Sequence, residues 1–272
     1  MVFNSIFFIF CFLPVFMLIY YLVPGKLRNL LLFLGSLIFY AWGEPVYVIL
    51  MLFSSIFNYY MGTELERLYY DDRKQKINLI FSIIINLAVL VFFKYYGFLL
   101  NTIGGIIGIH IPHPELSLPI GLSFYTFRNL SYLFDIYLSK VSAQRNFLTF
   151  AVYSTMFPYT SAGPIVRYTD IETQLKQRTI NISKFGIGAE LFVKGLAKKV
   201  LLADNLSVLY SSICGHPQMS VFTSWLGILA YTMQLYFDFS GYSDMAIGLG
   251  KIFGFHFLEN FDYPYISKSV TE

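Results

Sequence analysis

The sequence predicts an all-α, multi-pass integral-membrane protein, and three observations support that prediction. Hydrophobic residues make up 56% of the 272 residues and charged residues only 13%, whereas a soluble domain carries about 25% charged residues. Apolar runs close to the roughly 20 residues that cross a bilayer recur along the chain. Basic residues gather in alternate connections between these runs. Nothing in the composition marks a linker, so we expect one integral-membrane domain over residues 1–272.

The apolar runs are the candidate membrane elements, about seven to nine in all. The first run has no basic residue before its apolar core and no small-residue cleavage pattern after it. We therefore expect a retained span there and no removed signal peptide. The candidate elements are residues 2–23, 29–42, 46–62, 77–100 and 118–138, followed by less regular runs at 147–166, 185–211, 220–237 and 241–258.

The positive charges predict how these elements are oriented. They follow the first, third and fifth runs, whereas the connections around 43–45 and 101–117 contain no Lys or Arg. Because cytoplasmic loops of membrane proteins are enriched in Lys and Arg, we expect the N-terminus outside the cytoplasm. The basic residues are Lys26 and Arg28, then Arg67, Arg73, Lys74 and Lys76, then Lys140 and Arg145.

The run at 147–166 is expected to be a re-entrant element. It contains Pro158 and the sequence Ser-Ala-Gly-Pro at 161–164, and basic residues follow it from Arg167 to Lys184. A full crossing would place those charges outside, whereas an element broken at the prolines could return to the cytoplasmic side. Broken backbone at membrane depth is tolerated only where it is buried in protein or lines a cavity. An ordinary proline-kinked span is the alternative.

The segment from Gln234 to Tyr265 is apolar but carries acidic residues, among them Asp238 and Asp244. An Asp at the centre of a lipid-facing helix costs on the order of 2.5 to 3.5 kcal/mol, so we expect both to face a protein-lined or watered cavity. There a carboxylate could couple protons in a transporter, bind an ion, or orient a catalytic group. The candidate substrate-binding residues of this segment are Gln234, Tyr236, Asp238, Ser240, Tyr242 and Asp244.

Other chemistries find little support in the sequence. Cys11 and Cys214 lie far apart and no Cys/His cluster surrounds either, so no metal site is predicted. The glycines at 248, 250 and 254 lack the βαβ context of a dinucleotide site and are more typical of close helix packing. A net charge of +3 is too small to indicate nucleic-acid binding.

The four histidines and a group of three lysines are further candidates for functional residues. No histidine is predicted to be catalytic, because three lie in proline-containing loops and His256 is more typical of a packed or hydrogen-bonded side chain. Lys194, Lys198 and Lys199 form a basic patch that would anchor a helix to anionic headgroups or attract an anionic donor. The loop histidines are His110, His113 and His216.

Four segments of the chain form an ordered set of motifs. They read LPIGLSFYTFRNLSYLFDIY (118–137), FPYTSAGPIVRYTDIETQL (157–175), GLAKKVLLADNL (195–206) and QLYFDFSGYSDMAIGLGKIFGFHFLENFDYPY (234–265). Together they closely resemble the membrane-bound O-acyltransferase family. The resemblance is to its bacterial branch of alginate O-acetylation proteins, which is related to the D-alanyl transfer proteins of teichoic acid.

The resemblance implies an enzyme of the bacterial cytoplasmic (inner) membrane that transfers an acyl group, usually acetyl. The donor would be a cytoplasmic substrate, acetyl-CoA or an acyl-carrier species, and no bound cofactor is implied. The acceptor would be a hydroxyl of an extracytoplasmic polysaccharide such as alginate or another envelope glycan, or of a periplasmic or extracellular acetyltransferase partner protein. The implied architecture is a ring of tilted helices around a central funnel among membrane lipids. Arg167 would lie near the cytoplasmic mouth, where it could meet the charge of the donor.

The chain departs from the family pattern at its end. In relatives a Trp-Arg-Arg-Trp-His stretch follows that holds a functional histidine, and further spans hold another. Both would lie beyond Glu272, so no catalytic residue, and no general-base histidine, is predicted within this chain. We expect the chain to be the N-terminal part of such a protein, as a fragment, a truncated gene product or one half of a split protein. The competing hypotheses are an ion- or proton-coupled transporter and a non-catalytic scaffold of an envelope-modifying complex.

Overall fold

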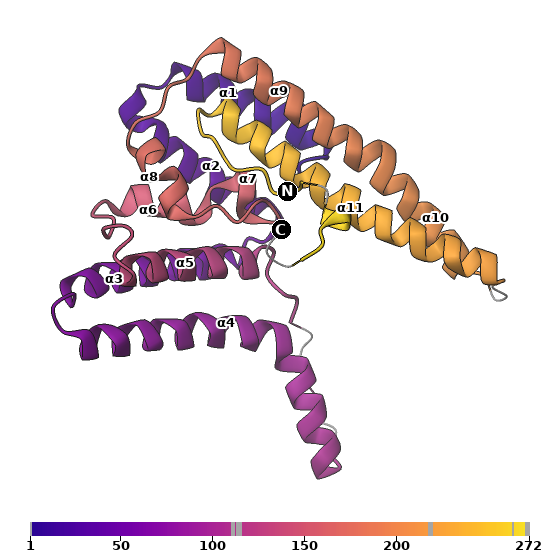
Figure 1. Cartoon of the computed structure of the whole chain (residues 1–272), viewed down its shortest axis with the longest axis horizontal. Helices are drawn as coiled ribbons and strands as arrows, with labels where there is room; N and C mark the ends of the chain where they lie inside the picture. Colours follow the sequence, from indigo (N-terminus) through magenta and orange to yellow (C-terminus); the bar gives the residue numbers. More distant parts are fainter. Residues whose placement is uncertain (1, 110–111, 113–115, 217–219, 263, 270–272) are drawn as a thin grey trace. The chain divides into compact units, whose positions relative to one another are not determined.

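The computed structural model describes residues 2–109, 112, 116–216, 220–262 and 264–269. Within these ranges the regular secondary structure is entirely helical, which confirms the all-α prediction (Figure 1). The chain divides into two compact units. The first comprises Met1–Leu22, Ala162–Val166 and Lys176–Glu272, and the second comprises Val23–Ser161 and Arg167–Leu175.

Helices of the second unit correspond to several predicted runs. Helix α3 packs against α4 and α5 (Figure 1). Helix α2 packs against α6 and α7. The helices of this unit are α2 (Arg28–Gly43), α3 (Val48–Arg67), α4 (Asp72–Ile107), α5 (Leu122–Tyr137), α6 (Phe147–Thr155), α7 (Phe157–Thr160) and most of α8 (Tyr168–Lys176).

Two helices of the part of the chain that the structure describes are long and apolar enough to cross a membrane, α3 and α4. A shorter apolar helical stretch covers Phe8–Leu22. Helix α4 begins after Asp71, whose side chain accepts a hydrogen bond from the Lys74 backbone N–H and pairs with Lys74 Nζ at 2.8 Å. The hydrogen bond from the Lys74 side chain, and then the one from its backbone N–H, lower the pKa of the Asp71 carboxyl. The carboxylate also interacts favourably with the positive end of the helix dipole.

The predicted break in the run at 147–166 is present. Helix α6 ends at Thr155, Met156 leaves the helical conformation, and α7 begins at Phe157 with Pro158 in its first turn. Proline is tolerated there because a first-turn N–H has no intrahelical partner. Residues 161–167 form no helix, so this segment is irregular over several residues. Its re-entrant path through a membrane stays a prediction.

The first unit contains a long interrupted helix that lies beside α11. Helix α9 (Ile182–Ala197) continues through a π-helical segment, η3 (Lys198–Ala203), into α10 (Asp204–Cys214). All three pack against α11 (Val221–Ile252), which runs in the opposite direction (Figure 1). The N-terminal helical stretch, η1 (Phe8–Phe12) and α1 (Leu13–Leu22), is joined to the turn after α11 by the Tyr20 hydroxyl, which donates to the Phe253 carbonyl at 2.8 Å.

The expectation of two separate elements at 220–237 and 241–258 is wrong. Helix α11 is continuous from Val221 to Ile252 and passes through Ser240 and Gly241 without a break. A glycine lowers helix propensity by only about 1 kcal/mol, which packing readily overrides. The chain turns after Phe253 at Gly254, whose φ of +87° favours glycine.

Candidate functional site

The polar segment predicted from the sequence lies on one helix, with Gln234, Tyr236 and the four further candidates all on α11. Arg167, by contrast, belongs to the second unit. It is exposed and precedes α8, where its backbone N–H donates to Asp170 Oδ2 at 3.3 Å. The association of Arg167 with the residues of α11 therefore stays a prediction.

Asp238 and Asp244 are paired with lysines of the neighbouring helix. Lys198 Nζ lies 2.6 Å from Asp244 Oδ2, and Lys199 Nζ lies 2.8 Å from Asp238 Oδ1. Lys199 also pairs with Asp204 Oδ1 at 2.8 Å. Both carboxylates thus face cations where the sequence suggested a cavity. Opposite charges within hydrogen-bonding distance explain how a largely apolar helix pair holds these five charged groups.

The same pairing changes the interpretation of the basic patch. Lys198 and Lys199 stand at the beginning of η3, and their side chains are 35% and 24% exposed. Lys194 is more exposed and pairs with Glu190 on its own helix. Lys198 and Lys199 therefore bind carboxylates of α11. The sequence had suggested anchoring to headgroups or attraction of an anionic donor, and neither prediction included this pairing.

Glycines let α9 and α11 approach closely enough for these pairs to form. A Cβ added to Gly241 would lie 2.7 Å from the Gly195 carbonyl oxygen. A Cβ added to Gly248 would lie 2.6 Å from the Gly188 carbonyl oxygen. Because real Cβ atoms do not come this near to backbone oxygens, both crossings require glycine. The prediction that the glycines at 248, 250 and 254 serve helix packing is confirmed for Gly248, whereas Gly250 lies against the Phe257 ring and Gly254 forms the turn after α11.

The remaining candidates on α11 point in other directions. Tyr236 packs against Phe261 and Tyr265, with ring centroids 6.0 and 5.5 Å away. Tyr242 stacks on Phe3 at 4.7 Å. Tyr236 and Tyr242 therefore contact different neighbours. Two of them bury polar atoms that lack a hydrogen-bond partner among the described residues, Ser240 through its Oγ and Gln234 through its Oε1.

Arg128 is a functional candidate that the sequence analysis missed. Its side chain is completely buried within α5, and its guanidinium donates to the carbonyls of Ser154 at 2.9 Å and Tyr159 at 2.8 Å. The guanidinium also lies over the Tyr159 ring at 4.1 Å. Ser154 and Tyr159 lie on either side of the break between α6 and α7, so Arg128 holds that break together. The signal was available, because an arginine inside an apolar run is as costly as an aspartate.

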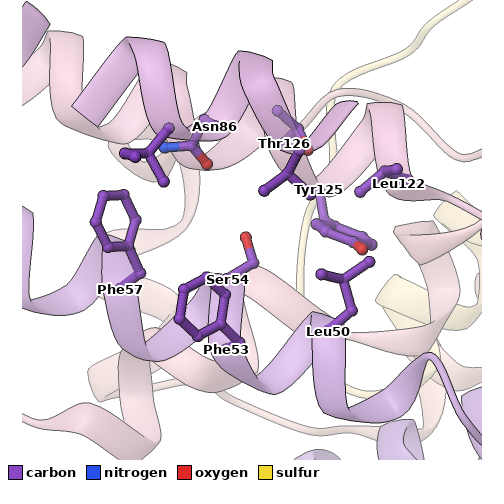
Figure 2. A pocket seen from close by; sticks show the side chains of 10 residues that line it. Leu50, Phe53, Ser54, Phe57, Asn86, Leu122, Tyr125 and Thr126 are labelled. Atoms are coloured by element: carbon purple, nitrogen blue, oxygen red, sulfur yellow. The ribbon is translucent and has the colours of Figure 1, made fainter. Parts of the chain in front are cut away.

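A small cavity with a mostly apolar lining lies among α3, α4 and α5 (Figure 2). Its volume is about 10 Å³, which suits roughly one water molecule. Ser54, Asn86 and Thr126 supply polar groups among leucine and aromatic side chains. Beside it Asn58 and Asn86 exchange amide hydrogen bonds of 3.0 and 2.9 Å. This cavity is too small for a sugar or an acyl donor.

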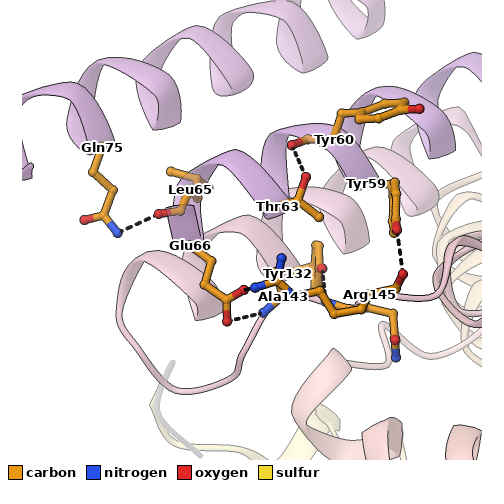
Figure 3. A network of polar contacts seen from close by, with 10 residues as sticks. Tyr59, Tyr60, Thr63, Leu65, Glu66, Gln75, Tyr132, Ala143 and Arg145 are labelled. Carbon is orange, nitrogen blue, oxygen red and sulfur yellow. Dashed lines mark hydrogen bonds and ion pairs between the residues drawn. The ribbon is translucent and has the colours of Figure 1, made fainter. Parts of the chain in front are cut away.

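A larger hollow opens where α3 and α5 end. It has a volume of about 410 Å³, within the usual range for small-molecule sites. Glu66, Tyr69 and Lys140 are among its lining residues. Figure 3 shows how Glu66 bridges to the loop after α5, where it pairs with Arg145 and accepts from the Ala143 N–H at 3.3 Å. The hollow lies on the side that the charge pattern predicts to be cytoplasmic.

Comparison with known proteins identifies the family. The model of MBOAT, the membrane-bound O-acyltransferase family, matches residues 45–271. The chain belongs to the membrane-bound O-acyltransferase family. The resemblance carried by the four motifs is thereby confirmed, and the family is membrane-embedded. The matched region includes α3, α11 and every candidate site residue.

Relatives within this family are named as enzymes that modify envelope polymers. The chain is 43% identical over 276 residues to the probable alginate O-acetylase AlgI of Pseudomonas aeruginosa, covering all of this chain and 53% of that protein. It is 32% identical over 307 residues to the peptidoglycan O-acetyltransferase of Helicobacter pylori, covering all of this chain and 58% of that protein. The teichoic acid D-alanyltransferase of Bacillus subtilis is 29% identical over 175 residues, 60% of this chain and 42% of that protein. The chain thus spans about half the length of the alginate and peptidoglycan relatives that it matches.

The histidines add no second candidate site. His216 follows α10 and is exposed, as is His256 in the segment after α11. His110 and His113 lie outside the described residues. Across the described part of the chain no group of three or more His, Cys, Asp or Glu side chains is placed to hold a metal ion.

Proposed function

We propose that this chain forms part of a multi-pass O-acyltransferase of the bacterial inner membrane. It would transfer acetyl from a cytoplasmic donor, acetyl-CoA or an acyl-carrier species, to hydroxyls of an extracytoplasmic glycan. The acceptor would be alginate or another envelope polysaccharide, reached directly or through a periplasmic or extracellular partner protein. The observation that supports this most strongly is similarity along the whole chain to proteins named as O-acetylases of alginate and peptidoglycan.

The residues of this chain would form one side of the reaction funnel. In the transfer, the acceptor oxygen attacks the acyl carbonyl while a general base takes its proton, and the donor's leaving group departs. We assign no histidine of this chain to the base. The part of this chain would be to bind and orient the substrates through Gln234, Tyr236, Asp238, Ser240, Tyr242 and Asp244, with Arg167 meeting the charge of the donor.

The path of the chain through the membrane belongs to the same proposal. We propose that 1–272 is one membrane domain with its N-terminus outside the cytoplasm and with α6, α7 and residues 161–167 as a re-entrant element. The irregular backbone of that element needs a protein-lined environment. Arg128, which bonds to carbonyls on both sides of its break, contributes such an environment.

The test is acetylation of a glycan by the full-length gene product. The gene is expressed in a bacterium that lacks its own glycan O-acetylation, and ester-linked acetate released from purified polysaccharide by mild alkali is measured. We expect acetate well above the background of the host. Asp238→Asn and Asp244→Asn should each lower it at least tenfold at equal protein level, because each substitution removes a charge that its lysine partner needs.

Asp72→Asn is the matched control, since Asp72 is an exposed acid in the first turn of α4. It should leave acetylation unchanged. Acetate at the background level with the unmodified protein would refute the activity. Full acetylation by both Asp238→Asn and Asp244→Asn would refute the role of the carboxylates only. Proton- or ion-dependent flux into vesicles without an acyl donor would favour the transporter hypothesis.

A further inference from the structure

The glycines of α9 and α11 define more than one way to align the two helices. Gly188 and Gly195 are seven residues apart, and Gly241 and Gly248 are also seven apart. In the antiparallel pair Gly188 meets Gly248 and Gly195 meets Gly241. A slip of seven residues would still bring one glycine opposite another, so a close crossing survives it. A slip of one turn would instead set larger residues against the glycines.

The charged residues have a different spacing. Lys198 and Lys199 are adjacent, whereas Asp238 and Asp244 are six residues apart. In the observed register both aspartates have a lysine partner. After a slip of seven residues in either direction, at most one aspartate stands opposite a lysine. The other loses its lysine partner while its side chain is only partly exposed, 46% for Asp238 and 25% for Asp244, which is unfavourable.

The two lysines stand at the beginning of a π-helical segment. Adjacent residues of an α-helix point about 100° apart, so two neighbouring lysines ordinarily face different directions. Here Lys198 and Lys199 begin η3, a segment with wider turns, and both reach α11. π-helical turns cost stability and are found mostly where function retains them.

We infer that Lys198 and Lys199 are positioning residues that set the register of α11 against α9. The glycines supply close packing that tolerates a seven-residue slip, and the two ion pairs exclude the slipped alignments. Polar and charged groups at a contact between helices can specify the register of that contact. In terms of the proposed function, on which this consequence rests, the register decides where the polar segment from Gln234 to Asp244 stands in the reaction funnel.

The test measures the distance between two spin labels on these helices. In the full-length gene product, Cys11 and Cys214 are first replaced by serine. Ile187→Cys on α9 and Met233→Cys on α11 then carry nitroxides, since both positions are about half exposed. In the observed register the two positions are offset by about 24 Å along the helix axes, and a seven-residue slip changes that offset by about 10 Å. Pulsed electron resonance resolves such a change.

Three variants separate register from simple stability. With all four charges replaced by leucine, we expect a second distance population shifted by roughly 10 Å. Lys198→Asp alone sets two carboxylates against each other and should abolish the native distance. Lys198→Asp with Asp244→Lys restores opposite charges and should recover it. The exchange is made at this pair because Asp204, beside Lys199, would repel an aspartate at 199.

Two results would overturn the inference. One is a single native distance in the variant with four leucines. The other is a native population in the exchanged pair no larger than in Lys198→Asp alone, which stays decisive even if the leucine variant fails to fold. The distance does not depend on acyl transfer, so a native distance without acetylation would refute the proposed function and leave the register inference standing.

Discussion

Arg128 has the largest side chain that the described fold buries completely. A buried guanidinium is tolerated only when its donors are used, and here two of them go to main-chain carbonyls. The carbonyls of Ser154 and Tyr159 lie beside the break between α6 and α7, where the regular helical bonding stops. Arg128 thereby replaces hydrogen bonds that a continuous helix would have made.

Replacing this arginine should loosen the break. Arg128→Met keeps much of the volume but leaves two buried carbonyls without these donors, so the free energy of unfolding should fall by about 2 to 4 kcal/mol. Denaturation of the purified protein in detergent measures this. Arg67→Met is the control, because the Arg67 side chain is 77% exposed and pairs with Glu64 on its own helix, and its effect should stay within about 0.5 kcal/mol. Equal losses for the two variants would contradict the role of Arg128.

The pairing of α9 with α11 shows how a helix packs when its contact surface carries both glycines and charges. The glycines bring the two backbones together, and the lysines of η3 then reach the aspartates. Neither feature suffices alone, because close packing without neutralisation would bury charges, and charges at longer range would pair weakly. The position of the polar segment therefore depends on the packing of the two helices as a whole, and on no single residue alone.

Gly195→Ala tests the close approach. The new methyl would overlap the Gly241 carbonyl oxygen and lie 2.7 Å from the Met245 backbone nitrogen. The helices must separate, so we expect a loss of about 1 to 3 kcal/mol in the free energy of unfolding. Gly186→Ala is the matched control on the same helix, since nothing lies within 4 Å of its added Cβ. It should be neutral or stabilise α9 by up to about 1 kcal/mol. A Gly195→Ala protein as stable as the Gly186→Ala protein would refute the crossing.

At the scale of the whole molecule, family membership places the chain in a membrane, and two described helices are long and apolar enough to cross it. Among the described helices, these two are both long enough and sufficiently apolar and free of charge. Other membrane elements of the proposal depend on neutralisation, as in α11, or on a broken path, as in α6 and α7. Composition alone therefore recognises only part of the embedded structure.

The predicted orientation can be checked by labelling single cysteines in a protein without Cys11 and Cys214. Val46 and Tyr70 are both exposed and lie at opposite ends of α3. Because the connection near Val46 lacks basic residues, Val46→Cys should react with a membrane-impermeant maleimide in intact spheroplasts. Tyr70→Cys should react only after permeabilisation. The reverse pattern would invert the proposed topology, and labelling of both from outside would show that α3 does not cross.

The sequence by itself determined the helical class, the membrane setting, the family and the segment in which polar residues gather. Composition, apolar run length and short motifs are local properties, so the amino-acid sequence alone contains them. Only the tertiary structure decided what Asp238 and Asp244 face. Their lysine partners lie some forty residues earlier in the chain, and only the packing of α9 against α11 brings them within reach. The cost of Arg128 inside an apolar run was visible in the sequence, but its partners were not, since the carbonyls of Ser154 and Tyr159 belong to other helices. No local pattern states which helices meet or in what register.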